Sequence, residues 1–165
     1  MGDFFMQINV DALNDIYQNA QMGIVGIDDV LNKTKNPKLY KELLKEKKEY
    51  QKILKSVKKM ISDEHGTVKE INLMAKIGSE IYSEMKLMKN ENDKFIIKMM
   101  IEGSYKSIGI LTTKRLSYEH ASNDVKKIMD DFISKLNTNI DTLKKIDKIC
   151  WIIYWVSIKS MLLLW

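Results

Sequence analysis

The stretch that decides the fold, residues 36–61, reads Asn-Pro-Lys-Leu-Tyr-Lys-Glu-Leu-Leu-Lys-Glu-Lys-Lys-Glu-Tyr-Gln-Lys-Ile-Leu-Lys-Ser-Val-Lys-Lys-Met-Ile. Asn36 can accept hydrogen bonds from the free N–H groups of a helix start, and Pro37, the single proline of the chain, suits the first helical position. Apolar residues then recur every three or four positions, which predicts one amphipathic helix over residues 37–65, ended by Gly66. The stripe consists of Leu39, Leu43, Tyr50, Ile53, Val57 and Met60.

The same spacing extends over nearly the whole chain of 165 residues. In the first helix Gly23 and Gly26 suggest that another backbone approaches closely, because glycine otherwise weakens a helix. Thr67 and Glu70 have the spacing of a capping box, which predicts the start of a shorter helix. The remaining predicted helices are residues 10–33, 68–88, 94–119 and 123–147, the last capped by Ser122, Asn123 and Asp124.

These elements predict an all-α fold. Short loops join the first helix to the second and the fourth to the fifth, so each pair should form an antiparallel hairpin. Residues 67–93 are long enough to carry the chain back along the whole bundle. We therefore expect a four-helix bundle with one long crossover over residues 1–148, followed by an apolar, aromatic-rich tail over residues 149–165.

Composition favours a water-soluble domain. The chain is 45% hydrophobic with a net charge of +5, and Arg115 is its only arginine. Lysines mixed with glutamates indicate a solvated surface more than a nucleic-acid interface, so no specific nucleic acid is expected. Cys150 is the single cysteine, and the N-terminus does not resemble a signal peptide. A cytoplasmic location is the resulting prediction.

The tail has three interpretations. Residues 149–165 hold all three tryptophans and no acidic residue. Lys144, Lys145 and Lys148 precede the tail, as they would precede a membrane anchor, but it is short for a span and Lys159 interrupts it. It could instead pack on the bundle or on a partner, or come from a shifted reading frame or an added extension.

Glu46 is the main candidate for chemistry. It lies on the apolar stripe of the second helix between Leu43 and Tyr50, and Glu49 follows three residues later. A buried carboxylate is costly unless it is paired or binds a metal, so this pair could hold a cation. The alternative is that Glu46 lies near the rim of the bundle and pairs with a lysine.

Two segments carry a resemblance, Ile16-Tyr17-Gln18-Asn19-Ala20-Gln21-Met22-Gly23 and Met99-Met100-Ile101-Glu102-Gly103-Ser104. Over residues 9–147 the chain resembles an uncharacterised ferritin-like family of low-GC Gram-positive bacteria. Ferritin-like di-iron proteins use one Glu from each of two helices and a Glu-x-x-His pair from each of the other two. The resemblance places their ligands at Gln21, Glu46, Glu49, Glu102, Leu136 and Asn139.

Three carboxylates and no histidine remain at those positions, which argues against di-iron oxidase chemistry. We therefore expect a non-enzymatic ferritin-like bundle with a degenerate metal site, no catalytic residues and no required cofactor, acting through a protein partner or self-association. One rival hypothesis is a protein that binds iron or another divalent cation through Glu46, Glu49, Glu102 and Gln21. Another is a bundle tethered to the membrane by residues 149–165. In the interior, Glu46 and Glu102 should approach each other, near Gln21, Tyr105 or Asn139 and at the level of Tyr50.

Overall fold

Four long helices form the protein in a computed structural model that describes residues 2–71 and 92–162, with side chains for 4–71 and 92–148. They are α1 (Gly2–Leu31), α2 (Pro37–Asp63), α5 (Asp93–Ser117) and α6 (Asn123–Leu162). The described residues outside them form turns and loops, without a strand. The predicted all-α bundle is thus confirmed.

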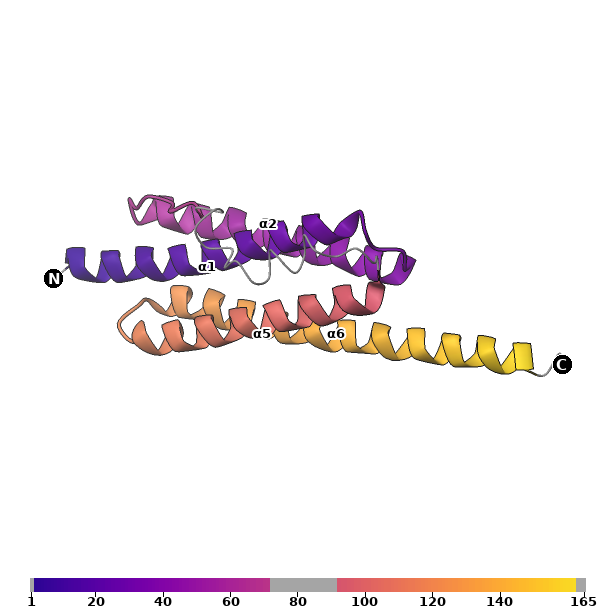
Figure 1. The fold of residues 1–165 in the computed structure, drawn as a ribbon. Helices are drawn as coiled ribbons and strands as arrows, with labels where there is room; N and C mark the ends of the chain where they lie inside the picture. Colours follow the sequence, from indigo (N-terminus) through magenta and orange to yellow (C-terminus); the bar gives the residue numbers. More distant parts are fainter. Residues whose placement is uncertain (1, 72–91, 163–165) are drawn as a thin grey trace.

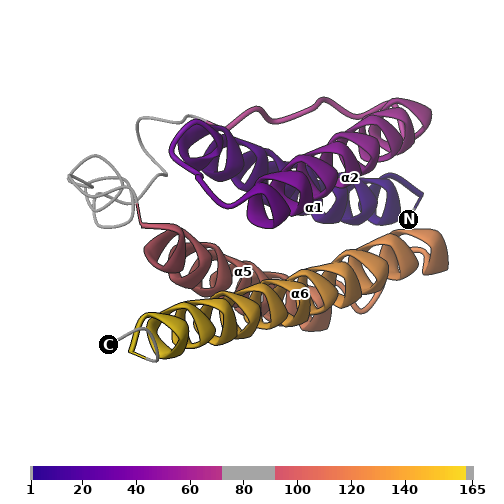
Figure 2. The same cartoon turned by 90° about the vertical axis from the view of Figure 1, so that its right-hand side faces the viewer.

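The helices form two layers (Figures 1 and 2). The hairpin α1–α2 makes one layer and the hairpin α5–α6 makes the other, with α5 beneath α1 and α6 beneath α2. The end of α2 and the start of α5 lie at opposite ends of the bundle. At one end a hydrogen bond of 2.9 Å from the Lys35 N–H to Asp93 Oδ1 joins the α1–α2 turn to the start of α5.

The helix starts follow the cap residues of the sequence. Asn36 Oδ1 accepts hydrogen bonds from the N–H groups of Lys38 and Leu39 at 2.8 and 3.2 Å, and Pro37 occupies the first helical position. Ser122 Oγ accepts one from the Val125 N–H at 3.3 Å. These bonds satisfy N–H groups that have no partner within their own helix.

The end of α2 departs from the prediction in one detail. His65, not Gly66, takes the left-handed conformation, with φ of 51°. Gly66 is needed for space, because a Cβ there would lie 2.5 and 2.8 Å from the two γ-carbons of Val10 on α1. The Gly66 N–H donates to the Ile61 carbonyl at 2.8 Å, which closes the helix and brings the chain against α1.

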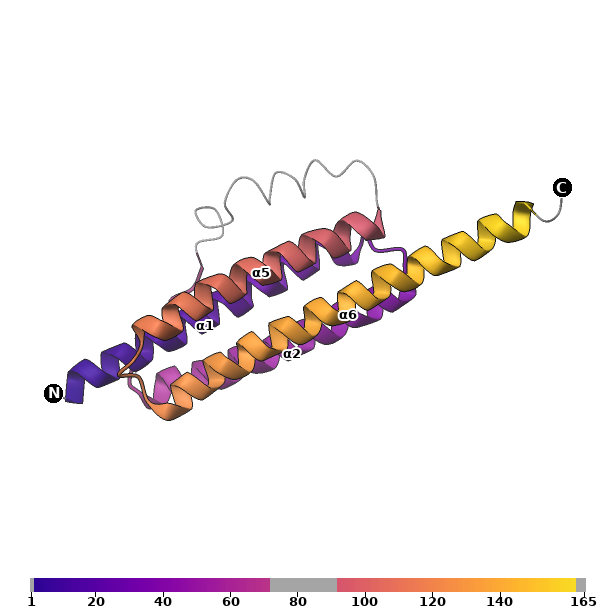
Figure 3. The same ribbon diagram turned by 90° about the horizontal axis from the view of Figure 1, so that it is seen from below.

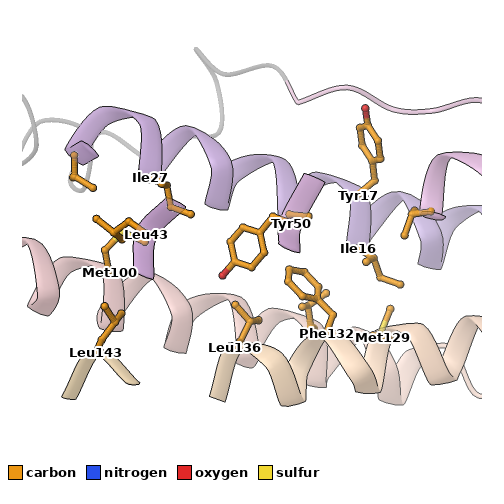
Figure 4. Packing of buried hydrophobic residues seen from close by; sticks show 14 of the residues in the cluster. Ile16, Tyr17, Ile27, Leu43, Tyr50, Met100, Met129, Phe132, Leu136 and Leu143 are labelled. Carbon is orange, nitrogen blue, oxygen red and sulfur yellow. The ribbon is translucent and has the colours of Figure 1, made fainter. Parts of the chain in front are cut away.

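Aliphatic and aromatic side chains from all four helices fill the space between the layers (Figure 4). Of the predicted α2 stripe, Leu39, Leu43, Tyr50 and Val57 are buried, while Ile53 and Met60 are partly buried. The buried face of α5 is less regular, because apolar residues surround its first turns and do not mark a single face. Its buried residues are Ile96, Ile97, Met99, Met100, Ser104 and Leu111.

Three expected boundaries are wrong. The first helix starts at Gly2 instead of residue 10, since no helix-breaking residue stands between positions 3 and 22. Residues 66–71 are not helical, so the capping-box spacing at Thr67 does not start a helix there; the rest of the predicted 68–88 helix lies outside the described residues. The final helix continues past residue 147 to Leu162. Its last part extends beyond the other three helices (Figure 3).

Candidate functional site

Glu46 is a buried carboxyl group in the middle of the bundle. Only 1% of the residue is exposed, because α2 turns this position toward α6 together with Leu43 and Tyr50. The Tyr50 hydroxyl, one helical turn further on, donates a hydrogen bond of 2.5 Å to Glu46 Oε1. The expectation that Glu46 lies at the rim and pairs with a lysine is therefore wrong.

The ring of Tyr50 is held from both layers. Its edge meets the ring of Phe132 on α6, with centroids 5.5 Å apart and planes at 82°. On the other side the ring fills the space that Gly23 of α1 leaves open. The close approach at Gly23 is thus to a side chain and not to a backbone, and nothing lies within 4 Å of a Cβ built at Gly26. Figure 4 shows Tyr50 between the layers beside Phe132.

Glu49 links α2 to α6 near the same level. Its Oε1 forms an ion pair of 2.8 Å with Lys135 Nζ, so this glutamate, and not Glu46, has the lysine partner. The other carboxylate oxygen of Glu49 and Oε2 of Glu46 are both buried without a hydrogen-bond partner. Nδ2 of Asn139, on α6, is buried in the same way. Two acceptors and one donor of a buried polar cluster are thus unsatisfied, which is costly.

The surroundings of Glu46 favour its neutral form. Burial raises the pKa of the carboxyl above its ordinary value, and the charges of Glu42 and Glu49 raise it further. The hydrogen bond from the Tyr50 hydroxyl lowers the pKa, but less than burial raises it. Burial also raises the pKa of the Tyr50 hydroxyl well above its ordinary value, so that this group remains a donor. A proton on Glu46 Oε2 turns one of the two unpaired acceptors of the cluster into a donor.

The other expected members of the site lie elsewhere. Glu102 is exposed on α5 and pairs with Lys98 at 3.7 Å, so it does not meet Glu46 across the interior. Tyr105 is 50% exposed and accepts a hydrogen bond of 2.9 Å from Lys144. Gln21 donates to a carboxylate oxygen of Glu70. Of the residues expected around Glu46, only Tyr50, Glu49 and Asn139 are nearby.

Side-chain amides on α1 form a second polar feature, which the sequence did not reveal. Residues 66–71 run along α1. Side-chain amides on two turns of α1 form hydrogen bonds with the backbone of these residues, as a neighbouring strand would. Asn14 donates to the Thr67 carbonyl at 3.0 Å and accepts from the Lys69 N–H at 2.6 Å. Gln18 donates to the Lys69 carbonyl at 3.0 Å, and Gln21 accepts from the Ile71 N–H at 3.2 Å. We call Asn14, Gln18 and Gln21 the amide row.

Two ionic or hydroxyl contacts reinforce the amide row. Lys69 Nζ pairs with Asp11 Oδ1 at 2.8 Å, and this hydrogen bond lowers the pKa of the Asp11 carboxyl. Tyr17 donates its hydroxyl hydrogen to Glu70 at 3.2 Å. The segment Ile16–Gly23, which carries the family resemblance, thus supplies several residues that hold the chain leaving α2. This placement indicates a structural role for Tyr17, Gln18 and Gln21.

Asn9 connects three parts of the chain at the end of the bundle where α1 starts. Its Nδ2 donates to Glu64 Oε1 after α2 at 2.8 Å, and its Oδ1 accepts from the Ser122 N–H before α6 at 2.8 Å. Only 7% of the residue is exposed. The only sequence signal for this role is a polar residue next to an apolar stripe, which is too weak to identify it.

No family model, curated protein or solved structure matched the chain when it was compared with known proteins. Among the described residues, no three or more His, Cys, Asp or Glu side chains gather as a metal site. Within the same part of the chain, no helix is both long and apolar enough to cross a bilayer.

Proposed function

We propose that this protein is a non-enzymatic, ferritin-like helical bundle that acts through protein contacts, chiefly self-association through the C-terminal part of α6. One observation carries the proposal. Among the side chains that the structure describes, which end at residue 148, Ile146 is the last buried residue of α6, and the helix continues to Leu162, about 24 Å further at 1.5 Å per residue. We call residues 147–162 the tail helix.

The composition of the tail helix supports this role. Its sequence after Asp147 contains no acidic residue, and Lys148 and Lys159 are its only basic ones. Ser157 and Ser160 are its short polar residues, and a helix that is apolar on most sides is normally buried against other protein or lipid. Because the tail helix extends beyond the other helices (Figure 3), a partner could cover it without disturbing the bundle.

The ferritin-like part of the proposal is supported by the arrangement of the two hairpins, with the end of α2 and the start of α5 at opposite ends of the bundle. The non-enzymatic part is supported by the residues at the family's ligand positions. Gln21 holds Glu70, Glu102 faces solvent, and Leu136 is a core residue. Glu46 is the one fully buried carboxyl among the described residues, and the Tyr50 hydroxyl donates a hydrogen bond to it.

Sedimentation velocity of the full chain and of a chain ending at residue 148 tests the proposal. The full chain should form larger species between about 1 and 100 µM, a range typical of weak self-association, whereas the shorter chain should remain monomeric. Circular dichroism should show similar helicity per residue for both. A full chain that remains monomeric throughout contradicts the proposal, and flotation with liposomes would then show whether the tail helix binds lipid instead.

A second candidate function is binding of a divalent cation by Glu46 and Glu49. It is favoured by the two buried carboxylate oxygens that have no hydrogen-bond partner. Carboxylate and amide oxygens are suitable ligands for hard cations, and Asn139 could contribute its Oδ1. Metal analysis of protein purified without chelators tests this. One metal ion per chain that disappears in Glu46→Gln would establish it.

A further inference from the structure

The outer side of α2 carries a continuous row of lysines. The lysines of this row recur at steps of three and four residues, a spacing that keeps them on one face of the helix. That face is opposite the buried residues of α2, and every lysine of the row is exposed. At 1.5 Å per residue the row is about 32 Å long. We call it the lysine stripe; it consists of Lys38, Lys41, Lys45, Lys48, Lys52, Lys55 and Lys59.

The glutamates of α2 do not neutralise the lysine stripe. Glu46 is turned into the bundle and is buried. Glu49 pairs with Lys135 of α6 at 2.8 Å, and Glu42 pairs with Lys45 at 2.9 Å. Within the described part of the chain, no other lysine of the stripe forms an ion pair. The mixture of lysine and glutamate in the sequence thus becomes a row of unpaired positive charges on the folded surface.

The acids of the α1–α2 hairpin leave the middle of the stripe positive. Asp28 of α1 forms an ion pair of 2.5 Å with Lys47, which flanks the stripe. Two exposed acids of these helices lack an ion pair among the described residues, Asp29 in the last turn of α1 and Asp63 at the end of α2. They lie at opposite ends of the hairpin, so neither interrupts the centre of the lysine stripe.

The lysine stripe suits a polyanion that is recognised through charge alone. No apolar or aromatic residue lies within it, and Tyr40, an exposed aromatic residue of α2, is about 100° around the helix from Lys41. A helix that binds a bilayer surface buries an apolar face in the lipid, whereas the apolar face of α2 is buried in the core. Proteins that bind single-stranded nucleic acid stack bases on aromatic side chains, which the stripe does not provide.

Double-stranded DNA has the form that matches such a row. It is a stiff rod with one negative charge per about 1.7 Å of its axis. A straight row with a lysine about every 5 Å can therefore contact phosphates in any register. An acidic protein would have to present carboxylates over the same length, and RNA duplexes are recognised mainly by shape and 2′-hydroxyl contacts across the minor groove.

We propose that the lysine stripe binds the phosphate backbone of double-stranded DNA without reading its sequence. Release of the counterions condensed on the phosphates supplies the free energy of such a contact. The stripe has no arginine, the residue most used to read guanine, so the contact agrees with the expectation that no specific nucleic acid is bound. The binding surface is the outer face of α2 and not the tail helix, so the proposal is independent of self-association.

A full-length variant with Lys48→Gln, Lys52→Gln and Lys55→Gln tests the proposal. Fluorescence anisotropy measures binding to a labelled DNA duplex of about 20 base pairs, about twice as long as the stripe at 3.4 Å per base pair. At about 50 mM salt the wild type should bind with a dissociation constant between about 1 and 100 µM, and equally to a duplex of unrelated sequence. The variant should bind at least about tenfold more weakly, and its slope of log affinity against log salt should be smaller by about 3.

The matched control removes the same charge from the other layer of the bundle. It carries Lys106→Gln, Lys145→Gln and Lys148→Gln, which replace exposed lysines of α5 and α6. Its affinity for the duplex should stay within about threefold of the wild type, because these lysines lie outside the stripe. Circular dichroism should show unchanged helicity in both variants, since glutamine and lysine have similar helix propensities.

Four results would overturn the proposal. The first is a wild-type chain that does not bind the DNA duplex up to about 100 µM at about 50 mM salt. The second is equal weakening by the stripe variant and the control, which would show that net charge and not the stripe matters. The third is tighter binding to a single strand or to an RNA duplex of the same length. The fourth is binding to liposomes that contain anionic lipid but not to DNA, which would assign the stripe to a membrane surface.

Discussion

Gly23 on α1 lies directly against the ring of Tyr50 on α2. A Cβ at position 23 would come to 2.7 Å from Cδ2 of that ring, a distance that real Cβ atoms essentially never show. The ring cannot easily move away, because its hydroxyl is bonded to Glu46 and its edge meets Phe132. The space beside Gly23 on α1 thus accommodates the ring of Tyr50, whose hydroxyl satisfies the buried carboxyl group of Glu46 on α2.

Gly23→Ala should therefore destabilise the protein, although alanine favours helix. We expect a loss of about 1–3 kcal/mol, the usual cost of overpacking a core. Gly26→Ala is the matched control, because a Cβ there meets nothing within 4 Å. It should stabilise by about 0.5–1 kcal/mol through helix propensity alone. Urea unfolding of both variants measures the difference; equal effects would contradict the packing at Gly23.

The raised pKa of Glu46 predicts a dependence of stability on pH. Between its ordinary value and the raised value, the folded state binds more protons than the unfolded state. Stability should therefore decrease as pH rises from about 4.5, the ordinary value, and level off above the raised pKa. Glu46→Gln has no charge to bury and supplies a donor, so it should be more stable at pH 7 by about 1–3 kcal/mol.

The advantage of Glu46→Gln should shrink toward pH 4, where the wild-type carboxyl is protonated in both states. Thermal unfolding from pH 4 to pH 8 measures this convergence. Glu102→Gln is the control, since Glu102 is exposed and pairs with Lys98 at the surface. Its stability should follow the wild type at every pH. A Glu46→Gln chain that is less stable at pH 7 would indicate that the carboxylate binds a cation or a donor.

The amide row predicts a local pattern of hydrogen exchange. The Lys69 N–H donates to Asn14 and the Ile71 N–H donates to Gln21, so each amide is protected by one side chain. Asn14→Ala should increase exchange mainly at Lys69, and Gln21→Ala mainly at Ile71. Gln51→Ala, on the exposed side of α2, is the control and should change neither amide. Unchanged protection in Asn14→Ala would show that residues 66–71 are held in another way.

Periodicity was sufficient to predict the four long helices. On α2 and α6 in particular, the apolar residues share one face of the helix, and that face must be buried. Cap residues fixed the start of α2 at Pro37 and of α6 near Asn123. The capping-box spacing at Thr67 was misleading. Local spacing cannot show that Asn14 and Gln18, more than fifty residues earlier, bind that backbone in an extended form.

The site was also predicted only in part, because spacing along one helix does not show how the helices pack together. Glu46 stands within a regular stripe, so its burial and its proximity to Tyr50 follow from helical geometry. Asn139 lies on α6, and only the family resemblance placed it near Glu46. The position of Glu102 could not be predicted in this way. Apolar residues surround the first turns of α5, and the phase of a helix without one clear stripe is set by its packing partners. In the structure Glu102 is exposed, which spacing alone did not indicate.

Asn9 provides the last test, because it joins both hairpins at the end of the bundle where α1 starts. Asn9→Asp keeps an acceptor for the Ser122 N–H but loses the donor to Glu64 and brings two carboxylates together where the bond of 2.8 Å now lies. We expect a loss of about 1–3 kcal/mol at pH 7, since a nearly buried group loses its partner. The loss should diminish below about pH 5, where protonation restores a donor between the two carboxyls.

Asn137→Asp, on the exposed face of α6, is the control and should change stability little. Thermal unfolding at pH 7 and pH 4 distinguishes the cases, and a pH-independent effect of Asn9→Asp would show that the contact with Glu64 does not contribute to joining the hairpins.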